Sequence, residues 1–332
     1  MSPPSSTLQW ILLALPTTII VAYLLTAFPI TSAPLIIYPS LNSLPDTSPS
    51  WKIYPEDCYN GGAYARLPHG NVRYWLIGPE DGERVVLIHG LSVPAFIWKD
   101  VAPHLAENGF RVLLYDLYGR GYTDAPETTY DTNLYTTQLA MLMQYVGWNN
   151  AHVAGVSMGG GIATAFSAQF PHLVSSKLAL IASTGLAQPG DLSRTSKFLS
   201  SPLMQQFAST FPFRWYLQYL ARCRKDDAPA DALIRLQSAY LPGFNPAVAS
   251  SLRDGPVLGL APAFAQLGRR TGARVLLMWG TADRVVPFVN AARVKKLIPH
   301  AELVTIEGAG HSLTMSHPQE VGRTLVRFFR QD

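Results

Sequence analysis

The stretch Gly155-Val156-Ser157-Met158-Gly159 stands between an apolar run that begins at His152 and a segment of helical period that ends at Gln169. Glycines on both sides of a serine permit a sharp turn between a strand and a helix. Such a turn exposes the serine hydroxyl at the end of the strand. The stretch therefore predicts a strand, a tight turn and a helix in this order, and it makes Ser157 the candidate nucleophile.

The same alternation continues on both sides of this turn. Continuous apolar runs such as Val85-Val86-Leu87-Ile88 are typical of strands that are buried on both faces. Seven strands are predicted, at residues 71–77, 84–89, 111–116, 152–156, 177–182, 274–279 and 302–306. Helices are predicted at residues 94–106, 132–145, 159–169, 289–298 and 318–330. This pattern predicts an α/β fold whose central sheet is mostly parallel and carries helices on both faces.

One interval interrupts the alternation. Between Ala182 and Arg274 the sequence has several helical patterns and no convincing strand. We expect a helical cap at about residues 187–265, lying over the carboxyl edge of the strands, where open α/β sheets bind their ligands. The cap is rich in aromatic residues, which either line a ligand pocket or form the cap's own core. They include Phe207, Phe211, Phe213, Trp215, Tyr216 and Tyr219.

A serine hydroxyl is a weak nucleophile and needs a base, usually a histidine that a carboxylate orients. Of eight histidines, His311 follows the flexible stretch Gly308-Ala309-Gly310 after the last predicted strand. Asp283 follows the strand before it through a short turn, and the order serine, aspartate, histidine is the one expected for this elbow pattern. Asp191 and Asp254 are rival carboxylates, but both fall inside or at the edge of the predicted cap.

Attack on a carbonyl also needs two N–H donors for the oxyanion, each worth about 3 to 4 kcal/mol in the transition state. The backbone N–H of Met158 is one candidate, because it opens the helix after the serine. The second candidate is the N–H of Leu91, in the loop that follows the strand ending at His89. We interpret His89 itself as a structural residue that holds this loop.

The glycines of Asp116-Leu117-Tyr118-Gly119-Arg120-Gly121 invite comparison with phosphate-binding loops. The stretch lacks both the G-x-G-x-x-G spacing and a Walker lysine, so a tight loop stabilised by Asp116 or Arg120 is favoured. No group of His, Cys and carboxylate residues has the spacing of metal ligands, and no cofactor or metal is predicted. Cys58 and Cys223 are too few for a disulfide framework.

The N-terminus has a different composition. Leu8 to Phe28 contains no charged residue and is long enough to span a hydrocarbon core. We expect a single-pass membrane anchor in residues 1–38, a Pro- and Ser-rich linker in residues 39–62 and a catalytic domain in residues 63–332. A cleaved signal peptide, and an interfacial hairpin or buried helix, remain alternatives. Because Lys52 is the first basic residue, neither orientation nor compartment is assigned.

The charge distribution limits the partners. The net charge is +4 and the pI is near 9.0, but Lys and Arg are scattered along the chain. A nucleic-acid surface needs clustered basic residues, so nucleic acid is not expected as a partner.

Together, His89-Gly90, Asp116-x-x-Gly-x-Gly121, the Ser157 turn, Asp283 and His311 resemble the α/β-hydrolase superfamily, over about Ala63 to Arg330. Within it, the apolar N-terminus and the Ser-Met-Gly-Gly elbow are similar to membrane-anchored monoacylglycerol-lipase-like hydrolases. This resemblance implies a helical cap and lipid-ester hydrolysis. The chain departs from epoxide hydrolases and haloalkane dehalogenases, which carry aspartate in place of the serine. It also lacks the His-Gly-Gly-Pro-Gly loop of proline iminopeptidases.

We therefore expect a serine hydrolase that cleaves a carboxylic ester through an acyl-enzyme. The catalytic residues would be Ser157, His311 and Asp283, and the oxyanion donors Leu91 and Met158. The favoured substrate is an apolar ester such as a monoacylglycerol; no substrate-binding residue is assigned. A hydrolase or acyltransferase of a small secondary metabolite, and a non-catalytic binding protein on the same fold, remain alternatives.

Overall fold

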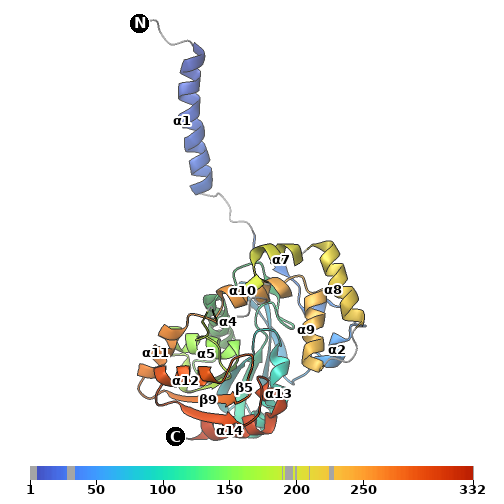
Figure 1. Ribbon diagram of the computed structural model, residues 1–332, viewed down its shortest axis with the longest axis vertical. Coiled ribbons are helices and arrows are strands. Elements are labelled where there is room, and N and C mark those ends of the chain that lie inside the picture. Colours follow the sequence, from blue (N-terminus) through green and yellow to red (C-terminus); the bar gives the residue numbers. More distant parts are fainter. Residues whose placement is uncertain are drawn as a thin grey trace. The chain divides into compact units, whose positions relative to one another are not determined.

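The computed structural model describes residues 6–27, 34–188, 190, 197–198, 200–208, 210–223 and 228–331 (Figure 1). The chain divides into two compact units, residues 1–36 and residues 37–332. The described residues of the first unit contain one helix, α1, from Ser6 to Ala27. All other helices and strands belong to the second unit.

The prediction of a transmembrane helix over Leu8 to Phe28 is not supported. A helix of 22 residues does form there, and Pro16 lies inside it. No helix in the described part of the chain combines the length and the hydropathy that are needed to cross a membrane. Phe28 lies outside the described residues.

The second unit is built on an eight-stranded sheet in the order β10-β9-β8-β7-β4-β5-β3-β2. All neighbours are parallel except β2 with β3 and β3 with β5. The strands are β2 (Gly62–Leu67), β3 (Gly70–Ile77), β4 (Glu83–Ile88), β5 (Phe110–Tyr115), β7 (Ala151–Val156), β8 (Val174–Ile181), β9 (Arg274–Gly280) and β10 (Glu302–Ile306). The carboxyl ends of the six parallel strands therefore lie at one edge of the sheet.

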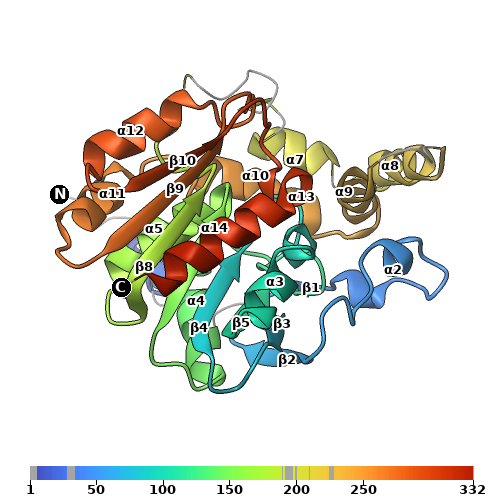
Figure 2. The same ribbon diagram turned by 90° about the horizontal axis from the view of Figure 1, so that it is seen from below.

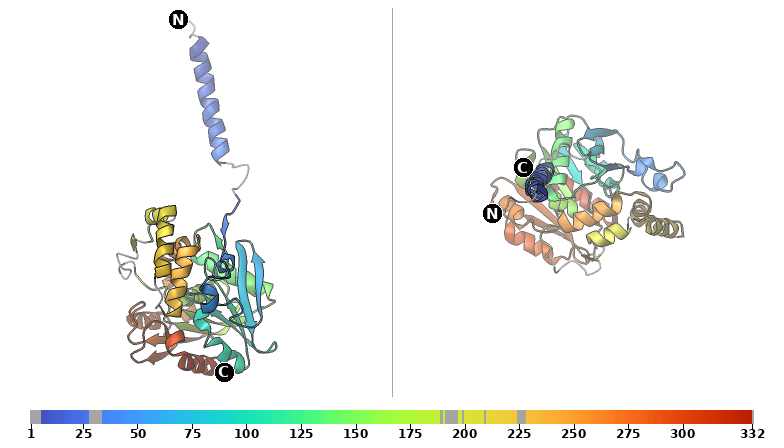
Figure 3. Two further views of the ribbon diagram at one scale, coloured as in Figure 1. Left: turned by 90° about the vertical axis from the view of Figure 1, so that its right-hand side faces the viewer. Right: turned by 90° about the horizontal axis from the view of Figure 1, so that it is seen from above.

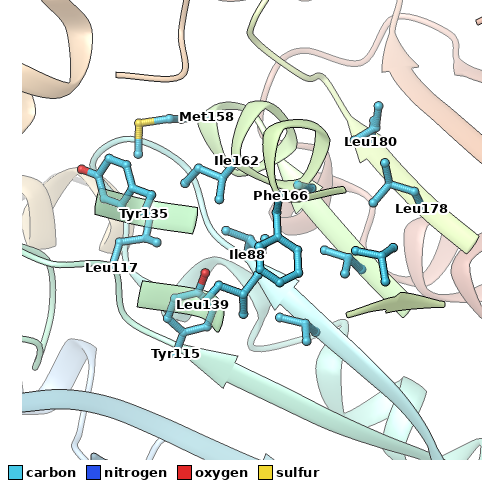
Figure 4. Packing of buried hydrophobic residues seen from close by; sticks show 14 of the residues in the cluster. Ile88, Tyr115, Leu117, Tyr135, Leu139, Met158, Ile162, Phe166, Leu178 and Leu180 are labelled. Carbon is cyan, nitrogen blue, oxygen red and sulfur yellow. The ribbon is translucent and has the colours of Figure 1, made fainter. Parts of the chain in front are cut away.

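The parallel strands inside the sheet send alternate side chains to two hydrophobic cores. In β4, Val86 and Ile88 join one core, while Val85 and Leu87 join the other, as the two-residue period of a strand requires. The first core is covered by α4 (Thr132–Tyr145), α5 (Met158–Gln169), α11 (Ala261–Arg269) and α12 (Val289–Leu297). Figure 4 shows Phe166 of α5 and Leu139 of α4 packed over Ile88. The second core is covered by α3 (Ala102–Glu107), α13 (Leu313–Ser316) and α14 (Pro318–Arg330) (Figure 2).

The predicted sheet is therefore confirmed, and the helices α4 and α14 begin and end where the sequence places them. The helix predicted at residues 94–106 is divided into a 3₁₀ turn, Ala95–Trp98, and α3. Pro103 lies in the first turn of α3, where backbone N–H groups have no acceptor within the helix. Proline is therefore tolerated there, and a new helix begins at this point. The strand β2 was not predicted.

The expected linker over residues 39–62 is corrected, because these residues pack in the second unit. β1 (Ile37–Tyr38) pairs with β6 (Ala125–Pro126), and the short helices Leu41–Ser43 and α2 (Ser50–Ile53) follow. Tyr54 is fully buried, and its hydroxyl donates to the Asp116 carboxylate. Large aromatic side chains among the Pro and Ser residues attach this segment to the sheet.

The insertion between β8 and β9 contains α7 (Pro202–Ala208), α8 (Phe211–Cys223), α9 (Pro229–Tyr240) and α10 (Phe244–Asp254). In Figure 3 these helices are coloured yellow to orange, and α8 packs against α9. The predicted boundary at residue 265 is corrected: it falls inside α11, whose Phe264 belongs to the first core of the sheet. The insertion therefore ends before α11.

Most of the cap aromatics whose side chains are described do not pack into a core. Trp215, Tyr216 and Tyr219 are exposed on α8, and the rings of Trp215 and Tyr219 stack with centroids 6.3 Å apart. Phe213 is partly buried. The side chains of Phe207 and Phe211 lie outside the described residues.

Candidate active site

Ser157 lies in a strained turn between the central strand β7 and α5. Its φ of 57° and ψ of −120° are unusual for a residue with a side chain. The turn is fixed by backbone bonds, since Ser157 N donates to Ile181 O at 2.9 Å and Thr184 N donates to Ser157 O at 3.0 Å. The serine is thus held at the carboxyl edge of the sheet with its hydroxyl partly exposed.

The two flanking glycines are needed because the backbone is crowded here. A Cβ on Gly155 would lie 2.1 Å from Gly159 O, and a Cβ on Gly159 would lie 2.3 Å from Ile88 O. Both contacts are with backbone atoms, which cannot rotate away. The glycines therefore let α5 start directly against β7 and β4.

His311 and Asp283 meet Ser157 at this edge. His311 Nε2 lies 3.0 Å from Ser157 Oγ, and His311 Nδ1 lies 2.8 Å from Asp283 Oδ2. The other carboxylate oxygen, Oδ1, accepts from the N–H groups of Val285 and Val286 at 2.8 and 2.9 Å. The Asp283 side chain is fully buried, whereas that of His311 is 19% exposed. The aspartate can therefore orient the imidazole, while the imidazole faces both the serine and an incoming substrate.

The loops that carry these two residues are joined through their backbones. Ala282 N donates to Ala309 O at 3.0 Å, and Thr281 N donates to Ile306 O at 3.1 Å. Gly280 is also in close contact, because a Cβ there would lie 2.2 Å from Ala309 O. The Asp283–His311 distance thus follows from the parallel pairing of β9 with β10.

The two expected oxyanion donors also lie at this edge. Met158 is the first residue of α5, where a helix leaves backbone N–H groups without an intrahelical acceptor. The loop of Leu91 adjoins the serine, since a Cβ on Gly90 would lie 3.4 Å from Ser157 Cβ. The structure therefore brings both segments to the serine.

His89 holds the Leu91 loop, as interpreted from the sequence. Its Nε2 accepts from Leu117 N at 2.8 Å, so Nδ1 carries the hydrogen and donates to Gly90 O at 2.9 Å. Burial lowers the pKa of His89 to about 3, the bond to Gly90 opposes this shift, and the Arg120 charge adds to it. The imidazole is therefore neutral and structural.

The glycine loop after β5 is occupied by internal contacts. Gly119 N donates to Asp124 O at 2.9 Å, and Gly121 N donates to the side chain of Gln237 at 2.7 Å. Asp116 accepts from Ala95 N at 2.8 Å, although burial raises the pKa of its carboxyl to about 7. Because these N–H groups have protein acceptors, the loop does not offer a phosphate cradle.

The rival residues lie elsewhere. Asp254 pairs with Arg253 at 2.6 Å on α10, and Asp191 lies outside the described residues. His152 pairs with Glu83 at 2.6 Å, on strands at the amino end of the sheet. Across the described residues, no cluster of three or more His, Cys, Asp or Glu side chains could hold a metal ion.

Sequence reasoning missed two polar residues of the insertion that contact this edge. Gln237 of α9 donates to Ser92 O at 3.3 Å, and Ser251 of α10 accepts from Arg120 at 2.7 Å. Both side chains are fully buried. Polar residues in a helical insertion have the signature of a solvated face, so their sequence gave no signal of burial. These contacts place α9 and α10 over the carboxyl edge, as expected for the cap.

An apolar cavity of about 590 Å³ lies beside the insertion, between the residue 44–53 segment and helices α8 and α9. It is lined by Leu44, Pro49, Ile53, Ala221, Leu236 and Tyr240, among others. None of the candidate catalytic residues lines it.

Comparisons with known proteins agree with this geometry. A family described as alpha/beta hydrolase fold matches residues 83–318. A non-heme chloroperoxidase of Streptomyces lividans is 27% identical over 282 residues, covering 78% of this chain and 96% of the relative. A 2-(acetamidomethylene)succinate hydrolase of Mesorhizobium japonicum is 25% identical, covering 74% and 88%. A solved membrane phospholipase A, described as a bacterial virulence factor, shares the fold with a TM-score of 0.65 and 22% identity, covering 98% of both chains.

Proposed function

Because this chain belongs to the α/β-hydrolase family, we propose that it is a serine hydrolase that cleaves a carboxylic ester through an acyl-enzyme. The observation that carries the proposal is the hydrogen-bonded series from Ser157 through His311 to Asp283, with distances of 3.0 and 2.8 Å. A strained serine at a strand end, a partly exposed imidazole and a buried carboxylate are the groups that nucleophilic acyl transfer requires.

The reaction proceeds in two halves. Ser157 Oγ attacks the carbonyl carbon while its proton passes to His311 Nε2, and the N–H groups of Leu91 and Met158 stabilise the oxyanion. The protonated imidazole then gives its proton to the departing alcohol, which leaves the acyl group on the serine. A water molecule, deprotonated by the same nitrogen, attacks the acyl-enzyme and releases the acid. Asp283 stabilises the imidazolium in both halves.

For the substrate we propose an apolar ester such as a monoacylglycerol. The support is compositional: the insertion over the carboxyl edge is rich in aromatic residues, and the basic residues of the chain are scattered. A phosphorylated or polyanionic substrate would require clustered cations. Apolar surface is instead recognised by burial, at roughly 25 cal/mol per Å².

A hydrolase of a small polar metabolite is the second candidate. It is favoured by the relative named 2-(acetamidomethylene)succinate hydrolase, which aligns with 74% of this chain. The two candidates share the catalytic residues and differ in how the rate depends on acyl-chain length.

The hydrolase mechanism is tested by pre-steady-state kinetics on p-nitrophenyl acetate. If an acyl-enzyme forms and breaks down more slowly than it forms, nitrophenol appears in a burst that matches the enzyme concentration, followed by a linear phase. Added glycerol separates hydrolysis from acyl transfer, because a transferase would form a glycerol ester in place of acetate. Absence of any turnover or acylation by the folded protein would refute the proposed function.

We also propose that the N-terminal segment attaches the enzyme to a membrane. The support is the absence of charged residues between Leu8 and Phe28 and the exposure of large apolar side chains on α1, including Trp10 and Leu15. Exposed apolar surface of this extent is unfavourable in water. Fractionation of cells that express the full chain tests this proposal.

A further inference from the structure

Arg120 is a fully buried cation beside the proposed oxyanion loop. It lies in the glycine loop after β5, to which the proposed mechanism assigns no role. Burying a guanidinium costs several kcal/mol unless all its N–H groups are satisfied. The acceptors of these N–H groups therefore show which segments of the chain Arg120 connects.

The five N–H groups of Arg120 reach four different segments of the chain. Nε donates to Leu91 O at 2.9 Å, in the loop after β4. Nη1 donates to Tyr118 O at 2.8 Å and to the Tyr135 hydroxyl of α4 at 2.5 Å. Nη2 donates to Ser251 Oγ of α10 at 2.7 Å, with Ala247 O at 3.5 Å. Each of these hydrogen bonds ends on a neutral oxygen.

The hydrogen bond to Leu91 O is important because it fixes the backbone of Leu91, and the N–H of the same residue is expected to bind the oxyanion. A hydrogen bond from a charged donor is about twice as strong as one between neutral groups. The next residue, Ser92, is held through its carbonyl by Gln237 of α9. Two helices of the insertion thus hold the loop that adjoins Ser157, one directly and one through Arg120.

We propose that Arg120 is a positioning residue that fixes the Leu91 oxyanion donor and couples it to helix α10 of the insertion. This inference rests on the proposed function, because it assigns Arg120 a role in that reaction. Lysine cannot replace it, since three donors on a single nitrogen cannot reach Leu91, Tyr135 and Ser251 together.

The test compares Arg120→Lys with the wild type on an ester and on the matching thionoester. Sulfur accepts hydrogen bonds more weakly than oxygen, so the ratio of the two kcat/KM values measures how well the donors stabilise the oxyanion. A general loss of folded enzyme lowers both rates equally and leaves this ratio unchanged. Arg253→Lys is the matched control, because Arg253 lies on α10 and is partly exposed.

We expect Arg120→Lys to lower kcat for the ester by about 10- to 100-fold, part of the 10²- to 10³-fold loss seen when an oxyanion donor is removed. KM should stay within about threefold, and the ester-to-thionoester ratio should fall about tenfold; Arg253→Lys should change neither. A folded Arg120→Lys enzyme with the wild-type kcat and ratio would overturn the inference.

If Arg120→Lys does not fold, Ser251→Ala and Tyr135→Phe each remove one acceptor of the guanidinium. Each substitution should lower the ester-to-thionoester ratio several-fold. If both variants fold and keep the wild-type ratio, the inference is overturned. Failure of the proposed function looks different, since the wild-type protein itself would then hydrolyse neither substrate.

Discussion

His311 Nε2 lies 3.0 Å from Ser157 Oγ, although the two residues are 154 positions apart in the chain. The contact follows from sheet order. Ser157 follows β7, His311 follows β10, and the strands run parallel, so both side chains emerge at the same edge. Asp283, which follows β9, completes the series from the same edge.

The first prediction concerns these three residues. Ser157→Ala and His311→Ala should each lower kcat on the order of a million-fold, because nucleophile and base act as a unit. Asp283→Asn should cost less, about 10⁴-fold, since the nucleophile and base remain. Turnover of p-nitrophenyl acetate measures all three, with thermal melts to show that the variants fold. Wild-type turnover by Ser157→Ala would exclude the assigned mechanism.

The second prediction concerns the glycines of the turn. Gly159→Ala places a Cβ 2.3 Å from Ile88 O and 2.5 Å from His89 O, so the strand or the helix must shift. Overpacking of this kind costs about 1 to 3 kcal/mol, and more where backbone is displaced. The melting temperature should fall by several degrees, and esterase activity should be lost with the turn geometry. Gly310→Ala is the control, because a Cβ there meets nothing within 4 Å; equal melting temperatures for the two variants would contradict the packing argument.

The third prediction uses the depressed pKa of His89. The folded-state pKa is about 3, below the ordinary value of 6.5, so folding favours the neutral imidazole. Its contribution to stability is complete above pH 6.5 and is lost as the pH falls towards 3, at about 1.4 kcal/mol per pH unit. Asp116 has a pKa raised to about 7, so its contribution to stability changes with pH in the opposite direction between about pH 4 and 7. In the wild type alone, this change masks the contribution of His89.

The His89→Gln variant isolates the histidine, because Asp116 is present in both proteins and largely cancels in the difference. Urea unfolding at pH 7.5 and pH 5 should show that the stability advantage of the wild type over His89→Gln shrinks at the lower pH. An advantage that stays constant would mean that His89 keeps an ordinary pKa in the folded protein.

The fourth prediction separates the two substrate candidates. If an apolar pocket binds the acyl chain, each added methylene contributes roughly 0.8 kcal/mol and raises kcat/KM about four-fold, until the pocket is full. A series of p-nitrophenyl esters, measured below micelle-forming concentrations, gives this slope. Equal values for acetyl and long-chain esters would remove the lipid proposal and favour the small-metabolite hydrolase.

The fifth prediction concerns membrane attachment. Full-length protein should sediment with the membrane fraction, whereas a chain that starts at Leu35 should be soluble. Because β1 and the residues after it belong to the second unit, the shortened chain keeps the packed segment and should hydrolyse p-nitrophenyl acetate at the wild-type rate. Recovery of full-length protein with an intact N-terminus in the soluble fraction would refute the attachment.

The central site could be predicted because its residues follow strands with strong apolar signals. Ser157, Asp283 and His311 each follow such a strand through a glycine-containing or short turn, and parallel strands bring their carboxyl ends together. The sheet itself could be predicted for the same reason. Burial on both faces makes its strands continuous apolar runs, as in Val85 to Ile88.

Features that depend on long-range packing could not be predicted. Tyr54 stands in a Pro- and Ser-rich segment, and its hydrogen bond to Asp116 is one of the distant contacts that place this segment in the second unit. The roles of Arg120 and Ser251 depend on a contact across 131 positions, and neither residue has a local pattern that indicates burial. Polar residues that are satisfied by distant partners resemble surface residues in the sequence.

The most direct test of the central claim is to identify the residue that a fluorophosphonate modifies. Such a probe phosphonylates a serine only when an adjacent base activates it. Peptide mass spectrometry of the treated protein should place a single stoichiometric adduct on Ser157. The modification should be far slower in His311→Ala and absent from that peptide in Ser157→Ala. A folded wild-type protein that forms no adduct, or an adduct on another serine at the same rate in Ser157→Ala, would contradict the account.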